Sequence, residues 1–362
     1  MTRRIAFIVS PFALLFAVCA FADGAFSGRD RFDLDRPEIR QFVDATAAEQ
    51  KIAPLEIYRL LAKAEPQPKI VELISKPAEK VSPWWQYRER FLTEQRVSEG
   101  TQFMLEHRAR LEKAHRDTGV SPEYVVAIIG VETFYGRITG KYRVLDALST
   151  LAFDYPARGE FFRGELAQFI ALTREEAVDP LTALGSYAGA MGASQFMPSS
   201  YRRYAVDGNN DQRRDLFADW DDIIASVANY FKEHGWVADG PVLSEAVLQP
   251  DAPVVADPTN LALNETIAGL RAKGVDFDPV SQAATTPALL VPAEQQLGPS
   301  YRVGFKNFEV ITRYNRSVRY AMAVHDLAAS IAGRVAVADA ASARKGTHLA
   351  ARKSDDEETA SR

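Results

Sequence analysis

One short segment, residues 125–136, constrains this chain more than any other, because it places an acid inside an apolar helical pattern. It reads VVAIIGVETFYG. Four of its residues fall at the helical positions i, i+3, i+4 and i+7: Val125, Ile128, Ile129 and Glu132. Most other positions are apolar too, so the predicted helix is nearly surrounded by protein. A carboxylic acid is therefore expected within the packing of the fold.

The burial of Glu132 allows two interpretations. Removal from water penalises a charged carboxylate and raises its pKa, and general-acid catalysis, for example on a glycosidic oxygen, requires an acid that stays protonated near neutral pH. Alternatively, an arginine or backbone donors satisfy the carboxylate within a structural network. This segment alone does not decide between them.

The start of the chain reads as a secretory signal. Arg3 and Arg4 precede an apolar run over residues 5–21, and Ala20-Phe21-Ala22 predicts cleavage after Ala22. The only cysteine of the chain, Cys19, lies inside this signal, so the mature protein has no disulfide and no thiol chemistry. Residues 16–18, FAV, fit a lipoprotein signal poorly, and soluble export is favoured over a lipid anchor at Cys19.

Length and composition indicate a chain with a large core, in one elaborate domain or two, and residues 36–120 carry helical spacing almost throughout. The chain has 362 residues, 47% of them hydrophobic, and its formal charge of −5 gives no electrostatic case for nucleic acid. Within the insertion named below, a helix is expected over residues 261–272 and a hairpin around Lys306-Asn307. The predicted organisation is a signal peptide (1–22), an N-terminal helical region (23–120), a catalytic core (121–240), a small α+β insertion (241–310), a C-terminal helix completing the core (311–333) and a disordered tail (334–362).

Residues 185–205, GSYAGAMGASQFMPSSYRRYA, have the composition of a groove floor. Their glycines permit close backbone approach, and Ser186 and Gln195 add small polar groups among apolar ones. Ser186 is not in a G-x-S-x-G setting, which argues against a nucleophile. The alternative is that the glycines serve helix packing and Gln195 is a structural amide.

A loop over residues 207–219 resembles an EF-hand. Side-chain oxygens stand at positions 1, 3, 5 and 9 of the loop, from Asp207, Asn209, Asp211 and Asp215. The carbonyl of Arg213 stands at position 7. Gln212 stands where glycine is expected, and Ala218 where glutamate is expected, although Asp219 follows. Two interpretations remain: a weak structural calcium or sodium site, or a solvated loop of Asx turns. No cofactor is expected to be required.

Four separated blocks carry a family resemblance. They are VETFYGR (131–137), GSYAGAMGASQFMPSSY (185–201), SVANYF with HGW (226–236) and ITRYNRSVRYAMAV (311–324). In this order they resemble the membrane-bound lytic murein transglycosylase B family of the lysozyme-like superfamily, over residues 36–333.

The resemblance implies a mainly α (α+β) fold: a lysozyme-like helical catalytic domain with a small insertion that contains a β-hairpin. It implies a periplasmic, monomeric enzyme that acts on peptidoglycan glycan strands. The enzyme would cleave the β-1,4 bond between N-acetylmuramic acid and N-acetylglucosamine and form 1,6-anhydromuramoyl ends. Proteins of cell-wall synthesis are further candidate partners.

The resemblance also assigns site residues. Glu132 matches the single catalytic acid and base. Ser186 and Gln195 match groove residues that contact the sugars, and Tyr230 and Asn315 match groups around the muramoyl acetamido substituent. The remaining matches are substrate-binding residues: Tyr87, Arg158, Tyr314 and Tyr320.

Two other functions are weighed against this one. A hydrolytic muramidase on the same scaffold normally needs a second carboxylate, and none accompanies Glu132 in the groove blocks. A non-catalytic peptidoglycan-binding protein has no use for a buried acid. The sequence therefore favours the lytic transglycosylase.

Overall fold

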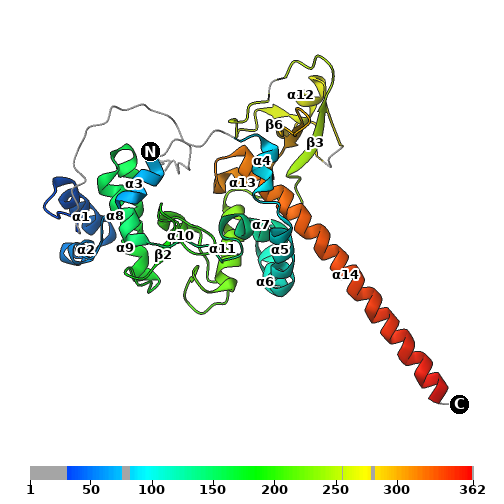
Figure 1. Cartoon of the computed structure of the whole chain (residues 1–362), viewed down its shortest axis with the longest axis horizontal. Helices are drawn as coiled ribbons and strands as arrows, with labels where there is room; N and C mark the ends of the chain where they lie inside the picture. The colour runs from blue at the N-terminus through cyan, green and yellow to red at the C-terminus, as the bar shows by residue number, and fades with distance from the viewer. Residues whose placement is uncertain (1–30, 76–81, 255, 279–281, 361–362) are drawn as a thin grey trace, which may run out of the picture.

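The computed structural model describes residues 31–75, 82–254, 256–278 and 282–360 (Figure 1). The predicted signal peptide, with Cys19, lies outside these residues. The N-terminal part of the described chain is helical, and its helices begin where the prolines allow: Pro37, Pro54 and Pro68 each open one. These helices are α1 (Pro37–Gln50), α2 (Pro54–Leu61), α3 (Pro68–Ser75), α4 (Trp84–Glu89), α5 (Glu94–Glu106) and α6 (Arg108–Thr118).

The helices form two lobes (Figure 1). The first lobe combines α1, α2 and α3 with α8 (Val144–Asp154), η1 (Pro156–Arg158) and α9 (Gly159–Glu175). The second lobe combines α5 and α6 with α7 (Pro122–Thr133), α11 (Trp220–Glu233), α13 (Lys306–Tyr314) and α14 (Val318–Ala360). The short strands β1 (Tyr142–Arg143) and β2 (Leu184–Gly185) pair with each other, and α10 (Pro198–Tyr204) packs against both α9 and α11. One apolar core extends through both lobes.

The insertion is a small sheet that has a core of its own on one face, while residues such as Leu289 and Val291 join the main core of the lobes. Its elements are β3 (Leu243–Leu248), β4 (Glu265–Thr266), α12 (Ile267–Ala272), β5 (Val275–Phe277), β6 (Pro287–Pro292) and β7 (Tyr301–Gly304). The strand order is β4-β6-β7-β3-β5 and all pairs are antiparallel. Alternate residues such as Leu290 and Val303, which are register partners, fill the core beneath it.

Two predicted elements of the insertion are corrected. Lys306-Asn307 does not turn a hairpin but begins α13, and the hairpin is formed by β6 and β7. Phe308 and Val310 alternate as residues of a strand do. Asn307 and Ile311, however, are buried at the spacing of a helix, and the segment forms a helix. The helix expected over residues 261–272 is limited to α12, which starts after Thr266 because that hydroxyl caps the Gly269 N–H at 3.0 Å.

Residues 334–360, for which the sequence predicts a disordered tail, continue α14 away from the lobes (Figure 1). Low hydrophobicity indicated disorder, but alanine, lysine, arginine and glutamate are also strong helix formers. Among the described helices, the stretch Val318–Ala343 is long and apolar enough to cross a membrane, with a mean hydropathy of 1.3. Half of its most apolar window is buried, and α14 packs against α7 and α5, as expected for a core helix.

A buried ion cluster joins the insertion to the second lobe. The Arg302 guanidinium of β7 donates to both carboxylate oxygens of Asp326 on α14, at 2.7 and 3.2 Å. Both side chains are only 9% exposed. Arg88 of α4 adds a third contact to Asp326 at 3.0 Å. The insertion is therefore fixed to α14 by charge pairing.

Candidate active site

The predicted acid lies in the last turn of α7, before an unusual helix end. Phe134, Tyr135 and Gly136 follow with φ angles of 52°, 59° and 83°. All three are left-handed, and for the two aromatic residues this conformation is costly. Contacts elsewhere must therefore hold the backbone that follows Glu132.

Thr133 and Tyr135 supply these contacts. The buried Thr133 hydroxyl donates to the carbonyl of Ala193 at 2.9 Å and accepts the Gly136 N–H at 3.0 Å. The Tyr135 hydroxyl donates to the carbonyl of Arg96 on α5 at 2.8 Å. A Cβ on Gly130 would lie 2.7 Å from the Tyr135 ring, so that glycine makes room for it. Thr133 and Tyr135 were not predicted from the sequence, because carbonyl partners far away in the chain leave no local pattern.

Tyr320 holds the Glu132 carboxyl. Its hydroxyl, in the first turn of α14, donates to Oε1 of Glu132 at 2.6 Å. The Glu132 side chain as a whole is partly exposed, but its carboxyl lies deep, and burial raises its pKa to about 7 while the Tyr320 hydrogen bond opposes the rise. Within the described residues no Lys, Arg or His forms an ion pair with Glu132. The partner that the described residues offer the Glu132 carboxyl is thus the Tyr320 hydroxyl.

Further tyrosines gather around the acid. Burial, and then the Glu132 charge, raise the pKa of Tyr314 and of Tyr320 well above its usual range. Burial raises the pKa of Tyr87 too, and the Glu132 charge adds to this. The Tyr230 ring lies 4.8 Å from that of Tyr314. The structure thus brings four predicted site tyrosines to one end of α7.

Their hydroxyls fix the surrounding backbone. Tyr314 donates to the carbonyl of Ser194 at 2.7 Å, and Tyr230 donates to the carbonyl of Arg313 at 2.7 Å. Asn315 follows Tyr314 directly, in an extended conformation that ends α13. These contacts fix the backbone that leads into Asn315.

Ser186 and Gln195 belong to turns of the glycine-rich segment. The Ser186 oxygen accepts the Ala190 N–H at 3.1 Å. Gln195 has a φ of 51°, and its amide nitrogen donates to the carbonyls of Thr139 and Gly192 at 3.0 and 2.9 Å. The nitrogen of Gln195 is thus structural, while its amide oxygen has no protein partner within the described residues.

Arg158 stands in the first lobe, at the end of η1. Its guanidinium lies 4.5 Å from the ring centroid of Phe161 and 5.2 Å from that of Phe162, and burial lowers its pKa. These contacts belong to η1 and α9. Glu132 and Tyr320 lie in the second lobe.

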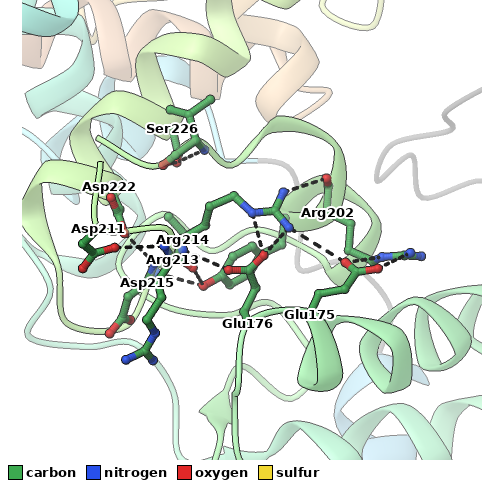
Figure 2. A network of polar contacts seen from close by, with 12 residues as sticks. Glu175, Glu176, Arg202, Asp211, Arg213, Arg214, Asp215, Asp222 and Ser226 are labelled. Atoms are coloured by element: carbon green, nitrogen blue, oxygen red, sulfur yellow. Dashed lines mark hydrogen bonds and ion pairs between the residues drawn. The ribbon is translucent and has the colours of Figure 1, made fainter. Parts of the chain in front are cut away.

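The loop over residues 207–219 is held by hydrogen bonds from its own backbone N–H groups to its side-chain oxygens. Asp207 accepts the Gln212 N–H at 2.7 Å, and Asp211 accepts the Arg213 N–H at 2.9 Å. Gln212 adopts a φ of 71°, the left-handed conformation that glycine provides in an EF-hand. Asp222, a fully buried acid that the sequence analysis missed, accepts the N–H of Gly208 and that of Asp215 at 2.7 and 2.6 Å (Figure 2). The loop is closed at both ends by this one carboxylate.

The oxygens of the loop fit a cation only in part. The Asn209 amide nitrogen donates to Asp219 at 2.8 Å, so the acid displaced beyond position 12 turns back towards the loop. In the part of the chain that the structure describes, no three His, Cys, Asp or Glu side chains converge as metal ligands. A cation would therefore also need the Asn209 oxygen and the Arg213 carbonyl.

An ion cluster beside the loop is structural. Arg214 donates to the buried Glu176 through its backbone N–H at 2.9 Å and through its guanidinium (Figure 2). A further guanidinium nitrogen of Arg214 donates to the carbonyl of Arg202 at 3.1 Å. A cavity of about 380 Å³ lies next to this cluster. Since its buried charges satisfy one another, they serve to hold the loop in place.

Comparison with known proteins gives concordant results. The family described as "Transglycosylase SLT domain" matches residues 35–329. Membrane-bound lytic murein transglycosylase B of Escherichia coli K12 is 40% identical over 310 residues, which cover 82% of this chain and 83% of that protein. The crystal structure of soluble lytic transglycosylase SltB1 from Pseudomonas aeruginosa superposes with a TM-score of 0.77 at 44% identity, covering 82% of this chain and 99% of that one.

A third relative was solved with an ion. The structure of Escherichia coli lytic transglycosylase Slt35 in complex with calcium gives a TM-score of 0.77 at 38% identity, covering 84% of this chain and 96% of that one. The family match begins before α1 and ends within α14, so it includes both lobes and the insertion.

Proposed function

Because this chain belongs to the transglycosylase SLT domain family and is a peptidoglycan lytic transglycosylase, we propose that Glu132 is its single catalytic acid and base. The observation that carries this proposal is the buried Glu132 carboxyl with a pKa raised to about 7 and with Tyr320 as its hydrogen-bond donor. Such an acid is protonated in a large fraction of molecules near neutral pH, as proton donation requires.

The reaction then needs one carboxyl group. Protonated Glu132 donates its proton to the glycosidic oxygen as the bond from muramoyl C1 to O4 of N-acetylglucosamine breaks. The muramoyl 2-acetamido oxygen stabilises the positive charge that develops at C1. The muramoyl 6-hydroxyl next bonds to C1, and the Glu132 carboxylate takes its proton, which restores the acid. No water is consumed, so the product is a 1,6-anhydromuramoyl end.

The surrounding residues support this course. None of the side chains described around Glu132 is a second carboxylate, which a two-carboxylate glycosidase needs. We assign Tyr230 and Asn315 to the acetamido group, and Ser186 and the amide oxygen of Gln195 to the sugars. Tyr87 and Tyr314 offer ring faces from the second lobe and α4, and Arg158 offers a cation from the first lobe.

The pH dependence of the reaction tests the Tyr320–Glu132 contact. Because the acid must start protonated, kcat/KM is expected to fall as pH rises through about 7. The Tyr320 hydroxyl stabilises the carboxylate, so Tyr320→Phe should raise the pKa of Glu132 and move this fall about one pH unit higher.

The control for this experiment is Tyr124→Phe. It removes another buried tyrosine hydroxyl, whose partner is His325 at 2.7 Å, and should leave the pH profile in place. A Tyr320→Phe profile that coincides with the wild type contradicts the proposed contact. The hydrolytic muramidase is tested separately, because the new muramoyl end that it forms is heavier by one water than the anhydro end.

We further propose that the loop over residues 207–219 binds calcium weakly as a structural ion. On binding, the predicted ligands would have to draw together around the ion: the side-chain oxygens of Asp207, Asn209, Asp211 and Asp215 and the carbonyl of Arg213. With a dissociation constant of about 1 mM, typical of weak calcium sites, 10 mM calcium should stabilise the fold by about 1.4 kcal/mol. The expected result is a rise in Tm of a few degrees, absent in Asp211→Asn and with sodium at equal ionic strength. A Tm that calcium leaves unchanged contradicts the site.

For the cellular setting, we propose soluble export to the periplasm and action there on peptidoglycan glycan strands. One relative is named membrane-bound and another soluble, so the relatives are compatible both with a membrane anchor and with a soluble form. The poor lipoprotein context of Cys19 favours the soluble form.

A further inference from the structure

Aromatic rings and guanidinium groups from four helices form a continuous row of contacts, called here the cation-ring row. Its members lie in or directly after α4, α5, α7 and α14: Tyr87, Phe91, Arg96, Phe134, Arg137 and Arg319. Arg319 lies 5.3 Å from the centroid of the Tyr87 ring, and the Tyr87 and Phe91 rings lie 5.2 Å apart. At the other end of the row, Arg137 lies 4.7 Å from the centroid of the Phe134 ring.

Arg96 joins the two halves of this row. Its guanidinium lies 5.3 Å from the ring centroid of Phe91 and 4.6 Å from that of Phe134. It also donates to the carbonyl of Arg90 at 2.6 Å. None of the described acids forms an ion pair with Arg96, and its buried Nε has no hydrogen-bond partner among the described residues. This half-buried cation is therefore stabilised largely by the faces of two rings.

Arg96 contacts both of the strained aromatic residues that follow Glu132. Phe134 and Tyr135 have φ angles of 52° and 59°, a left-handed conformation that is costly for aromatic residues. The Arg96 guanidinium lies against the ring of Phe134, and the Arg96 carbonyl accepts the Tyr135 hydroxyl at 2.8 Å. One residue of α5 thus holds two consecutive side chains at the point where α7 ends.

The link from Arg96 to the acid is the backbone. Burial raises the pKa of Glu132 to about 7 and the Tyr320 hydrogen bond opposes the rise, whereas the Arg96 charge does not contribute to it. Phe134, however, is only two residues from Glu132, and its position depends on Arg96. Arg96 can therefore act on the acid through the conformation of the chain that follows it.

We propose that Arg96 is a positioning residue for the acid, which holds Phe134 and Tyr135 in place and thereby keeps water away from the Glu132 carboxyl. This proposal rests on the proposed role of Glu132. It assigns Arg96 no contact with the substrate. Its part is to keep the carboxyl in the surroundings that proton donation near neutral pH requires.

The pH profile of the reaction reports this role, because few other groups near the acid titrate in the same range. The Glu132 charge acts on three tyrosines, and burial raises the pKa of each. They are Tyr320 of α14, Tyr314 of α13 and Tyr87 of α4. A hydrogen bond from an arginine lowers the pKa of Glu99 on α5. Of these groups, Glu132 is the one that titrates near pH 7.

Arg96→Met is expected to move the fall of kcat/KM about one pH unit lower. Methionine keeps a long apolar side chain but leaves no cation between the two rings. When the backbone after Glu132 loosens, water reaches the carboxyl, and its pKa drops from about 7 towards the ordinary value because burial no longer raises it. At pH 8, kcat/KM should therefore be about tenfold lower than in the wild type. The measurement is the release of anhydromuropeptides at a series of pH values, in which Tyr320→Phe should shift the fall the opposite way.

Two further variants connect this shift to the contact between Arg96 and Phe134. Arg96→Lys restores a cation and should recover part of the shift. Phe134→Leu removes the ring while Arg96 stays, and should move the profile in the same direction as Arg96→Met. The double variant should shift the profile no further than the larger single change, because both changes remove one contact. Shifts that add in full overturn the proposal.

The matched control is Arg271→Met, which removes a guanidinium that lies 4.8 Å from the Phe277 ring in the insertion. The net charge changes by the same amount, so the pH profile should stay in place. Tm is measured at each pH, because an unfolded fraction lowers kcat/KM without changing the pKa of the folded enzyme. If Arg96→Met does not fold, Phe134→Leu alone gives the same test.

Profiles of Arg96→Met and Phe134→Leu that coincide with the wild type overturn the proposal. Glu132→Gln separates the two hypotheses. If this variant stays active, the proposed acid is wrong, whereas a Glu132-dependent enzyme whose profile does not move refutes the role of Arg96 alone.

Discussion

Replacement of Glu132 by glutamine is expected to lower the release of anhydromuropeptides by about 10³-fold or more. Glutamine keeps the shape of the side chain and can still accept the Tyr320 hydrogen bond, but it can neither donate the proton to the glycosidic oxygen nor remove one from the 6-hydroxyl. Both steps of the proposed reaction need an ionisable carboxyl group, so this one substitution removes both. The measurement is the mass of the muropeptides released from purified peptidoglycan by the mature protein and by Glu132→Gln.

The masses distinguish the three functions. Anhydromuramoyl ends that disappear in the variant support the proposed reaction and its acid together. Reducing ends, heavier by one water, that disappear in the variant keep Glu132 but make the chain a hydrolase. No release by either protein favours the peptidoglycan-binding function.

Folding of the variant is the necessary control. The folded-state pKa of Glu132 is raised to about 7, above its unfolded value, so its contribution to stability is complete at low pH and is lost as pH rises through about 7. Glu132→Gln stays neutral and should be at least as stable as the wild type at pH 8. A large fall in Tm at pH 8 would mean that lost activity reflects lost structure.

The largest loss of stability is expected from Asp326→Asn. It leaves the Arg302 guanidinium, in a side chain only 9% exposed, without its charged partner on α14. Breaking a buried pair in this way typically costs about 3–5 kcal/mol, because the remaining charge stays desolvated. Glu245, the other acid near Arg302, is 69% exposed and cannot compensate for much. Calorimetry should show a fall in Tm of about 10 °C.

Asp339→Asn is the matched control on the same helix. Asp339 pairs with Arg108 at 2.8 Å, but these side chains are 51% and 45% exposed. A surface pair of this kind contributes at most about 1 kcal/mol. If the two variants lose the same stability, the Arg302–Asp326 contact does not hold the insertion on α14.

The sequence predicted the helices better than the insertion, for physical reasons. Prolines at the first turns of α1, α2 and α3 and the apolar period of α7 are local signals, and the structure follows them. Around Phe308 the apolar residues satisfy a strand period and a helical period together, and tertiary packing decided between them. In residues 334–360 the composition fits a solvated chain and a solvated helix equally well.

The site residues divide in the same way, into those that a sequence pattern marks and those that no pattern marks. Glu132 was found from its place on an apolar stripe, and Tyr87, Tyr230, Tyr314 and Tyr320 from the family resemblance. Thr133 and Asp222 were missed, although both are buried and hydrogen-bonded to backbone at key turns. Their partners are main-chain groups, which every residue carries, so no residue pattern in the sequence identifies them.

The course of α14 limits which parts of the protein can be exchanged or deleted. Tyr320 and Asp326 lie about 9 Å apart along this one helix, and they contact the proposed acid and the insertion respectively. The insertion has its own core and strand order, which would normally suit it to exchange between proteins. Here the ion pair between the insertion and Asp326 and the hydrogen bond between Tyr320 and Glu132 both depend on α14. Deleting or grafting the insertion is therefore expected to disturb the geometry of the acid, and domain shuffling at this position should be poorly tolerated unless the Arg302–Asp326 contact is transferred with it.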